Sequence, residues 1–119
     1  MALSKADIFN RKDHRIEPVD VPEWGGTVHV RTLTAAERDA FDASTVKVGR
    51  NGKGEPCLDN LRGRLGVLVI CTPEGDRIFE DADAGELGRK NAAALDRVLE
   101  VARRMNGMAT DSVEDARGN

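Results

Sequence analysis

Apolar side chains recur every three or four residues in the C-terminal part of the chain, between Asn91 and Gly107. This spacing places them on one face of a helix, and the arginines and the glutamate between them on the other. Asn91 is a good N-cap residue, and Asn106-Gly107 is a good stop. The pattern predicts an amphipathic helix over 91–106, with its apolar face formed by Leu95, Val98, Leu99, Ala102 and Met105.

Three further helices are predicted from end signals and weaker periodicity. Thr34-Ala-Ala-Glu37 fits a capping box, in which the threonine hydroxyl and the glutamate carboxylate each accept a backbone N–H, and it predicts a helix over 34–44. Asp83-Ala-Gly-Glu86 has the same form and predicts a short helix over 83–88. A last weakly amphipathic helix is expected over 110–117.

The N-terminal region predicts a β-hairpin over about 15–31, preceded by an arm over 1–13. Val28 and Val30 alternate with His29 and Arg31, as in a strand with one buried face. Pro18 restricts the first strand to a sheet edge. In the arm, Ser4 either caps a short helical turn or belongs to a partly ordered segment. Because an isolated hairpin is marginally stable, its valine face is expected to pack on helices.

The segment 58–71 has two interpretations. Apolar residues at helical spacing from Leu58 favour a helix that becomes apolar on all sides at Val67–Cys71. The β-branched residues favour instead a strand over 66–72, which a turn at 73–76 leads into 77–79. The longer periodic run favours the helix.

Residues 46–56 contain three glycines, one proline and three basic residues, which predicts an exposed flexible loop. The alternative is a second hairpin that pairs 46–48 with 56–58 around Asn51-Gly52. Together these elements predict one α+β domain over 1–119, mainly α, in which the N-terminal hairpin packs on a small bundle of about four helices.

Charge and composition exclude several classes of protein. The net charge is −3 and the pI is about 5.4, which argues against a domain that binds nucleic acid by neutralising phosphates. The longest apolar run, 67–71, is far shorter than the roughly 20 residues that span a membrane. The N-terminal residues do not resemble a signal peptide, so Cys57 and Cys71 are expected to be reduced thiols.

Few residues suggest reaction or cofactor chemistry. His14 and His29 lie in or beside the hairpin, and a zinc site that combines them with a cysteine is possible on paper only. The glycines of 49–54 do not form a phosphate-binding loop. Close helix packing explains Gly63-x-x-Gly66 more simply than a ligand does. No catalytic, cofactor-binding or metal-ligating residue is predicted, and the chain is not expected to be an enzyme.

Two features admit a role in binding. The segment 74–86 holds six acidic residues and one arginine, which suits a solvated helix start or, alternatively, a basic partner. Trp24 is the only tryptophan, and it is either a partner anchor or the lid of a core that is poor in aromatic side chains.

Three stretches of the sequence resemble the tail assembly chaperones of long-tailed bacteriophages and prophages. They are Val21–Phe41 (VPEWGGTVHVRTLTAAERDAF), Asp76–Ala84 (DRIFEDADA) and the helix over 92–107. The resemblance spans nearly the whole chain and rests on the order of the motifs. The turn at 73–76 and Gly85 depart from the family's pattern.

The resemblance implies a non-enzymatic role in virion assembly in the cytoplasm of the bacterial host. Such chaperones coat the tape-measure protein, help recruit the major tail-tube protein, and are absent from the mature virion. A coat of many small copies gains from multivalency while each contact stays weak, so self-association is expected. No nucleic acid, membrane or cofactor is implied.

The apolar helix surfaces over 58–71 and 92–105 are the expected source of the cover for the client, although part of each must form the core. A structural head–tail or tail-tube joining protein of the virion is the alternative function, and a small enzyme or metal-binding regulator is a third. The residues predicted to contact partners are Trp24, Leu61, Leu65, Leu68, Val98 and Met105.

Overall fold

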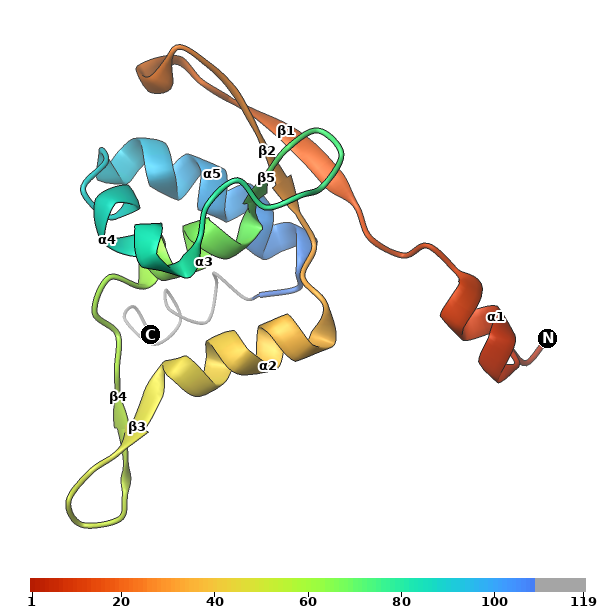
Figure 1. Ribbon diagram of the computed structural model, residues 1–119, viewed down its shortest axis with the longest axis horizontal. Helices are drawn as coiled ribbons and strands as arrows, with labels where there is room; N and C mark the ends of the chain where they lie inside the picture. Colours follow the sequence, from red (N-terminus) through yellow and green to blue (C-terminus); the bar gives the residue numbers. More distant parts are fainter. Residues whose placement is uncertain (109–119) are drawn as a thin grey trace, which may run out of the picture.

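The computed structural model describes residues 1–108 and confirms the predicted α+β class (Figure 1). Within these residues a three-stranded antiparallel sheet has the order β1-β2-β5, and two further strands, β3 and β4, form a separate hairpin. The predicted helix over 110–117 lies outside the described residues. The helices are α1 (Lys5–Asn10), α2 (Ala35–Ser44), α3 (Leu61–Val69), α4 (Ala84–Leu87) and α5 (Ala92–Met105); the strands are β1 (Ile16–Val21), β2 (Gly26–Arg31), β3 (Val46–Val48), β4 (Gly54–Pro56) and β5 (Ile70–Cys71).

The N-terminal hairpin forms where it was predicted. β1 and β2 pair over their full length, from Ile16 opposite Arg31 to Val21 opposite Gly26, and a 3₁₀ turn over Pro22–Trp24 joins them. Gly25 ends this turn at φ 78°, in the left-handed region that favours glycine. β1 is an edge strand, which explains how it accommodates Pro18.

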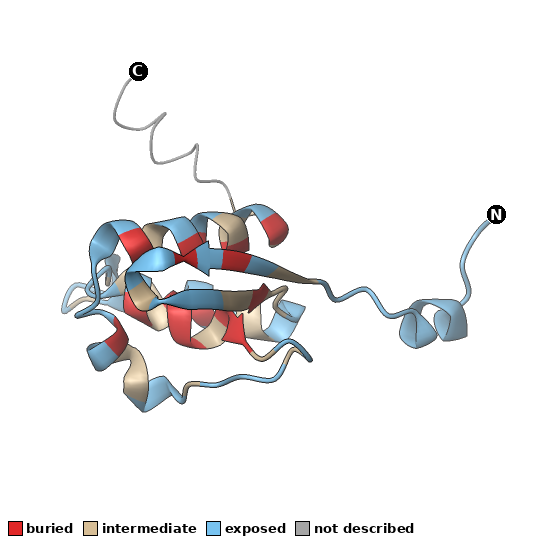
Figure 2. Ribbon diagram, turned by 90° about the horizontal axis from the view of Figure 1, so that it is seen from above, coloured by how far each residue is buried: buried red, intermediate tan, exposed pale blue. Residues whose placement is uncertain are grey.

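The core lies between the sheet and two helices. Val19, Val21, Val30 and Ile70 are buried, and β1 and β2 both contact α5. Figure 2 shows the buried residues gathered where the strands and helices face each other. α3 packs against α4 and α5. In α2, the buried residue is Phe41.

The helices with clear end signals begin at the predicted residues. The Thr34 hydroxyl accepts the Glu37 N–H at 3.1 Å, and the Glu37 carboxylate accepts the Thr34 N–H at 2.9 Å. The Asn91 side chain accepts the Ala94 N–H at 3.0 Å. The apolar face predicted for the helix over 91–106 is buried in full: Leu95, Val98, Leu99, Ala102 and Met105.

The segment 58–71 combines its two interpretations, so the single helix predicted there is wrong at both ends. The helix runs from Leu61 to Val69, and Leu58 stays exposed. Ile70 and Cys71 then form β5 on β2, with Cys71 opposite His29. Two arginines outside the helix bind its last carbonyls: Arg31 Nε donates to the Leu68 carbonyl at 2.9 Å, and Arg77 Nε donates to the Val67 carbonyl at 3.0 Å. They supply partners for carbonyls that a helix end leaves unpaired.

The short helix α4 begins directly after Asp83, as predicted, but Asp83 makes no capping bond to this helix. The Glu80 N–H donates to the Asp83 carboxylate at 2.8 Å, so the cap lies at 80–83 rather than at 83–86. A 3₁₀ turn over Asp81–Asp83 leads into the helix. α4 crosses α3 at Gly63 and Gly66, where a Cβ would meet the Ala84 carbonyl and the Leu87 side chain respectively. Close packing therefore explains both glycines, as predicted.

Residues 46–56 form the second hairpin rather than the predicted loop. Val46 lies opposite Pro56, Lys47 opposite Glu55 and Val48 opposite Gly54. The strand that returns is Gly54–Pro56, two residues earlier than in the alternative interpretation. Gly52 takes φ 77° in the turn, which the Asn-Gly pair favours.

Candidate partner-binding surface

The structure places three of the six predicted partner residues inside the core. Leu65, Val98 and Met105 are buried, and they present no surface to another protein in this fold. Trp24, Leu61 and Leu68 are half-buried and pack against the core. The periodic faces of α3 and α5 thus serve mainly the chain's own interior.

The exposed apolar surface lies elsewhere, on two elements that extend from the body (Figure 1). One is the N-terminal arm and the other is the β3–β4 hairpin; Leu58 and Ile78 add to the exposed apolar side chains of the body. Apart from Leu58, which lies in the helix surface expected over 58–71, none of these residues was predicted to bind a partner. The signals that could have found them are the apolar pair of residues at 8–9 and the alternation of Val46 and Val48. The exposed large apolar residues are Met1, Leu3, Ile8, Phe9, Val46, Val48, Leu58 and Ile78.

The arm carries a capped helix that makes no contribution to the core. The Ser4 hydroxyl accepts the Asp7 N–H at 3.1 Å, and the Asp7 carboxylate accepts the Ser4 N–H at 2.9 Å, which lowers the pKa of Asp7. No residue of α1 is buried. The arm's root is fixed at Thr32, whose hydroxyl bonds His14 Nδ1 at 3.1 Å and accepts the Arg15 N–H at 3.0 Å. The arm is therefore attached at its root, and α1 lies apart from the body (Figure 1).

The second hairpin presents one apolar and one polar face. Val46 and Val48 share a face because they are two residues apart on one strand, and their exposed fractions are 54% and 77%. Lys47 and Glu55 lie opposite each other on the other face. Together with Arg50 and Lys53, Lys47 makes the hairpin basic. We call the valine side, with Pro56, the hairpin face.

Arg64 of α3 ties together the two ends of this hairpin. Its guanidinium donates to the carbonyls of Ser44, Cys57 and Asp59 at 3.1, 2.7 and 3.0 Å, and to the Ser44 hydroxyl at 3.0 Å. The Cys57 N–H also donates to the Thr45 carbonyl at 2.7 Å. The base of the hairpin is thereby held on the body while its face stays exposed.

We expect Arg64→Leu to loosen the hairpin without unfolding the chain. A hydrogen bond from a charged group contributes about 1.5–3 kcal/mol, so amide exchange over 46–57 should become at least about tenfold faster. Hydrogen–deuterium exchange measures this. Arg62→Leu is the matched control, because Arg62 pairs with Asp96 at the surface and not with the hairpin. Unchanged protection in Arg64→Leu would contradict this role.

A cleft lies between α2 and α3. It encloses about 350 Å³. Four of its lining side chains are charged, and all four are engaged within the chain: Arg31 binds Glu37, Arg77 binds Asp81, and Arg64 holds the hairpin base. The apolar part of the lining comes from Ala40, Phe41, Val67, Leu68 and Ala84. We call this hollow the α2–α3 cleft.

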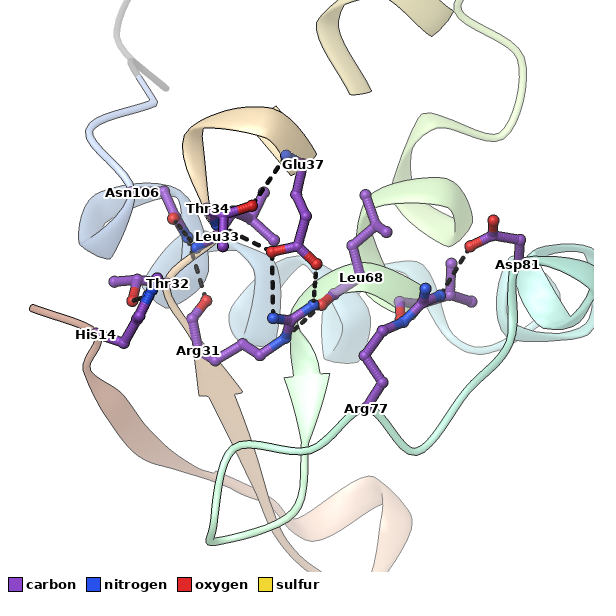
Figure 3. Close-up of polar contacts among 11 residues, drawn as sticks. His14, Arg31, Thr32, Leu33, Thr34, Glu37, Leu68, Arg77, Asp81 and Asn106 are labelled. Carbon is purple, nitrogen blue, oxygen red and sulfur yellow. Dashed lines mark hydrogen bonds and ion pairs between the residues drawn. The ribbon is translucent and has the colours of Figure 1, made fainter. Parts of the chain in front are cut away.

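Figure 3 shows the polar network beside the cleft, where β2, α2, α3 and α5 meet. Arg31 forms two bonds to the Glu37 carboxylate, at 3.3 and 2.9 Å. Asn106 accepts the Leu33 N–H at 2.7 Å and donates to the carbonyls of Arg31 and Ala102. Arg38 donates to the Asn106 carbonyl at 3.0 Å. This network fixes the start of α2 against the end of α5.

The Arg31–Glu37 pair makes stability depend on pH. Bonds from Arg31 lower the pKa of Glu37 below its usual 4.5. The stabilisation is therefore present above pH 4.5 and is lost as the pH falls below it. We expect Glu37→Gln to cost about 1–2 kcal/mol at pH 7 and much less at pH 3, as measured by urea unfolding. The control is Asp39→Asn, on the exposed side of α2, whose effect on the free energy of unfolding should not change with pH. A loss for Glu37→Gln that is the same at pH 7 and pH 3 would show that the Arg31–Glu37 pair is not the cause.

Among residues 1–108, no three or more histidine, cysteine, aspartate or glutamate side chains are grouped to hold a metal ion. Cys57 and Cys71 are both free. Burial raises the pKa of the Cys71 thiol, which disfavours the reactive thiolate. Within 1–108 there is also no helix with the length and apolar character to cross a membrane.

These features define a class: a small α+β protein whose exposed apolar elements suit it to bind other polypeptides. A family model described as phage tail assembly chaperone matches residues 3–118. The chain therefore belongs to the phage tail assembly chaperone family, as the resemblance predicted. No curated protein and no solved structure matches the chain significantly.

Proposed function

We propose that this chain is a non-enzymatic chaperone that binds the tape-measure protein in the cytoplasm of the bacterial host. It covers apolar helical stripes of this client during tail assembly, helps recruit the tail-tube protein, and leaves before the virion is complete. Family membership supports a role in tail assembly. The observation that carries the finer proposal is the exposed hairpin face.

The hairpin face combines apolar side chains with a basic rim, which suits the binding of an amphipathic helix. Val46 and Val48 are absent from the core cluster, so their apolar surface is available to a partner. A two-stranded hairpin is marginally stable alone, and burial of this face against a client would stabilise both. The rim of Lys47, Arg50 and Lys53 suits acidic side chains beside the apolar stripe of a client helix.

Weak contacts of this size suit a chaperone that must be displaced. Two valines and a proline bury little area, so one copy binds weakly. Many copies along one extended client bind firmly through multivalency and still dissociate one at a time. Of the predicted partner residues, the half-buried Trp24 and Leu61 remain candidates for further contacts at the edge of such an interface.

Co-expression with the tape-measure protein of the same phage tests the proposal. A tagged copy of this chain should retain the tape-measure protein on an affinity column, with several copies of the chain for each client. Purified virions analysed by mass spectrometry should lack the chain. Recovery of the chain in stoichiometric amounts from virions would contradict the proposal and favour the structural joining protein.

A further inference from the structure

The helix α1 is too short to be stable by itself. Isolated helices of fewer than about 12 residues are marginal in water, and α1 has six. Its apolar side chains are largely exposed, with 70% for Leu3, 57% for Ile8 and 75% for Phe9. Leu3 precedes the Ser4 cap, and Ile8 is the fourth helical residue, which is the spacing of a hydrophobic staple. The arm thus presents an apolar patch, and a surface that covers this patch would also stabilise α1.

The α2–α3 cleft has the size and lining to accept this patch. Its volume of about 350 Å³ is of the order of one or two large side chains, and Ala40, Phe41 and Leu68 contribute apolar surface to it. Its four charged side chains are bonded to other groups of the same chain. An apolar occupant therefore leaves these pairs intact.

Charge favours contact between the arm of one copy and the body of another. Residues 1–15 hold four basic side chains and two acidic ones, a net charge of +2. Because the whole chain carries −3, the remainder carries −5. Two bodies repel each other, whereas arm and body attract.

We propose that α1 of one copy docks in the α2–α3 cleft of a second copy of this chain. His14 and Arg15 fix the root of the arm at Thr32, and α1 extends away from the body (Figure 1). Each copy offers one arm and one cleft, so the contact is head-to-tail and can continue from copy to copy. It supplies the contact between neighbours that the proposed coat needs, but it does not depend on the client.

Sedimentation of the purified full-length chain without client tests the proposal. The wild type should self-associate with increasing concentration. Ile8→Ser with Phe9→Ser removes the arm's apolar patch, and Ala40→Arg fills the cleft from an exposed position of α2. Each should weaken association about 100-fold or more. The matched controls are Ala2→Ser with Ala6→Ser, and Ala43→Arg, which should associate like the wild type.

A mixture of the two variants gives the sharpest result. The arm variant keeps a free cleft and the cleft variant keeps an intact arm, so an equimolar mixture should form a heterodimer and nothing larger. A wild type that stays monomeric, or variants that associate like the wild type, would overturn the proposal. A mixture that stays monomeric would overturn it as well. Binding of the tape-measure protein by the Ala40→Arg variant, measured separately, tests the proposed function independently of self-association.

Discussion

Val46→Thr with Val48→Thr is expected to abolish capture of the tape-measure protein while the chain stays folded. Threonine keeps the β-branched shape that strands favour but puts a hydroxyl on the hairpin face. Burial of one valine contributes about 1.5 kcal/mol or more, so loss of both should weaken binding about 100-fold. A titration of purified chain against a tape-measure fragment with an apolar stripe measures this effect.

A matched control separates loss of the apolar face from damage to the hairpin. Glu55→Thr introduces the same residue on the opposite face of the same hairpin and should bind within a few-fold of the wild type. Circular dichroism should be unchanged for both variants, because neither valine belongs to the core. Equal binding by the valine variant and the wild type would show that the client contacts another surface.

Gly63→Ala is expected to cause the largest loss of stability among conservative substitutions. A Cβ at this position would clash with the backbone carbonyl of Ala84, which accepts a 2.8 Å bond from the Asn60 amide. Backbone cannot move aside as a side chain can, so overpacking should cost about 2–3 kcal/mol after the helix propensity of alanine is included. The midpoint temperature of thermal unfolding should fall by about 10 °C.

Two other glycines of the same helix pair provide controls. At Gly66 the added Cβ would lie 2.6 Å from Leu87 Cδ2, a side-chain end that can shift more readily than backbone, so the loss of stability should be smaller than at Gly63. At Gly85 nothing lies within 4 Å, and alanine should stabilise α4 by up to about 1 kcal/mol. A loss at Gly85 as large as that at Gly63 would show that the approach of α4 to α3 is not the cause.

Local signals were sufficient for the parts of the fold that are determined locally. Caps at Thr34 and Asn91 satisfy N–H groups within the same turn, and a one-sided apolar pattern identifies the buried face of α5 without knowledge of its neighbours. Pro18 likewise identifies an edge strand, because its ring lacks the N–H that a central strand needs. These features are confirmed.

The end of α3 could not be predicted in this way. An apolar run such as 67–71 suits a buried helix and a buried strand equally well. Arg31 and Arg77 bind the last carbonyls of the helix, and β2 offers Ile70 an open edge. Arg31 and β2 lie far from Val69 in the sequence, and Arg77 lies beyond the turn at 73–76, so tertiary contacts determine where the helix ends.

The same limit affected the partner surface. A periodic apolar face does not reveal whether the chain itself or another protein covers it, and the sheet covers that of α5. The prediction that Leu65, Val98 and Met105 contact a partner is therefore wrong, because all three are buried. The loop was preferred to the β3–β4 hairpin because the strands are short, and Arg64, which holds their ends, lies outside the segment.

The most direct measurement is the soluble fraction of the tape-measure protein when it is expressed with and without this chain. The account predicts that the client is largely insoluble alone, becomes soluble with the wild type, and stays insoluble with the Val46→Thr, Val48→Thr variant. A tape-measure protein that is equally soluble in all three cases would contradict the claim that this chain covers its apolar surface.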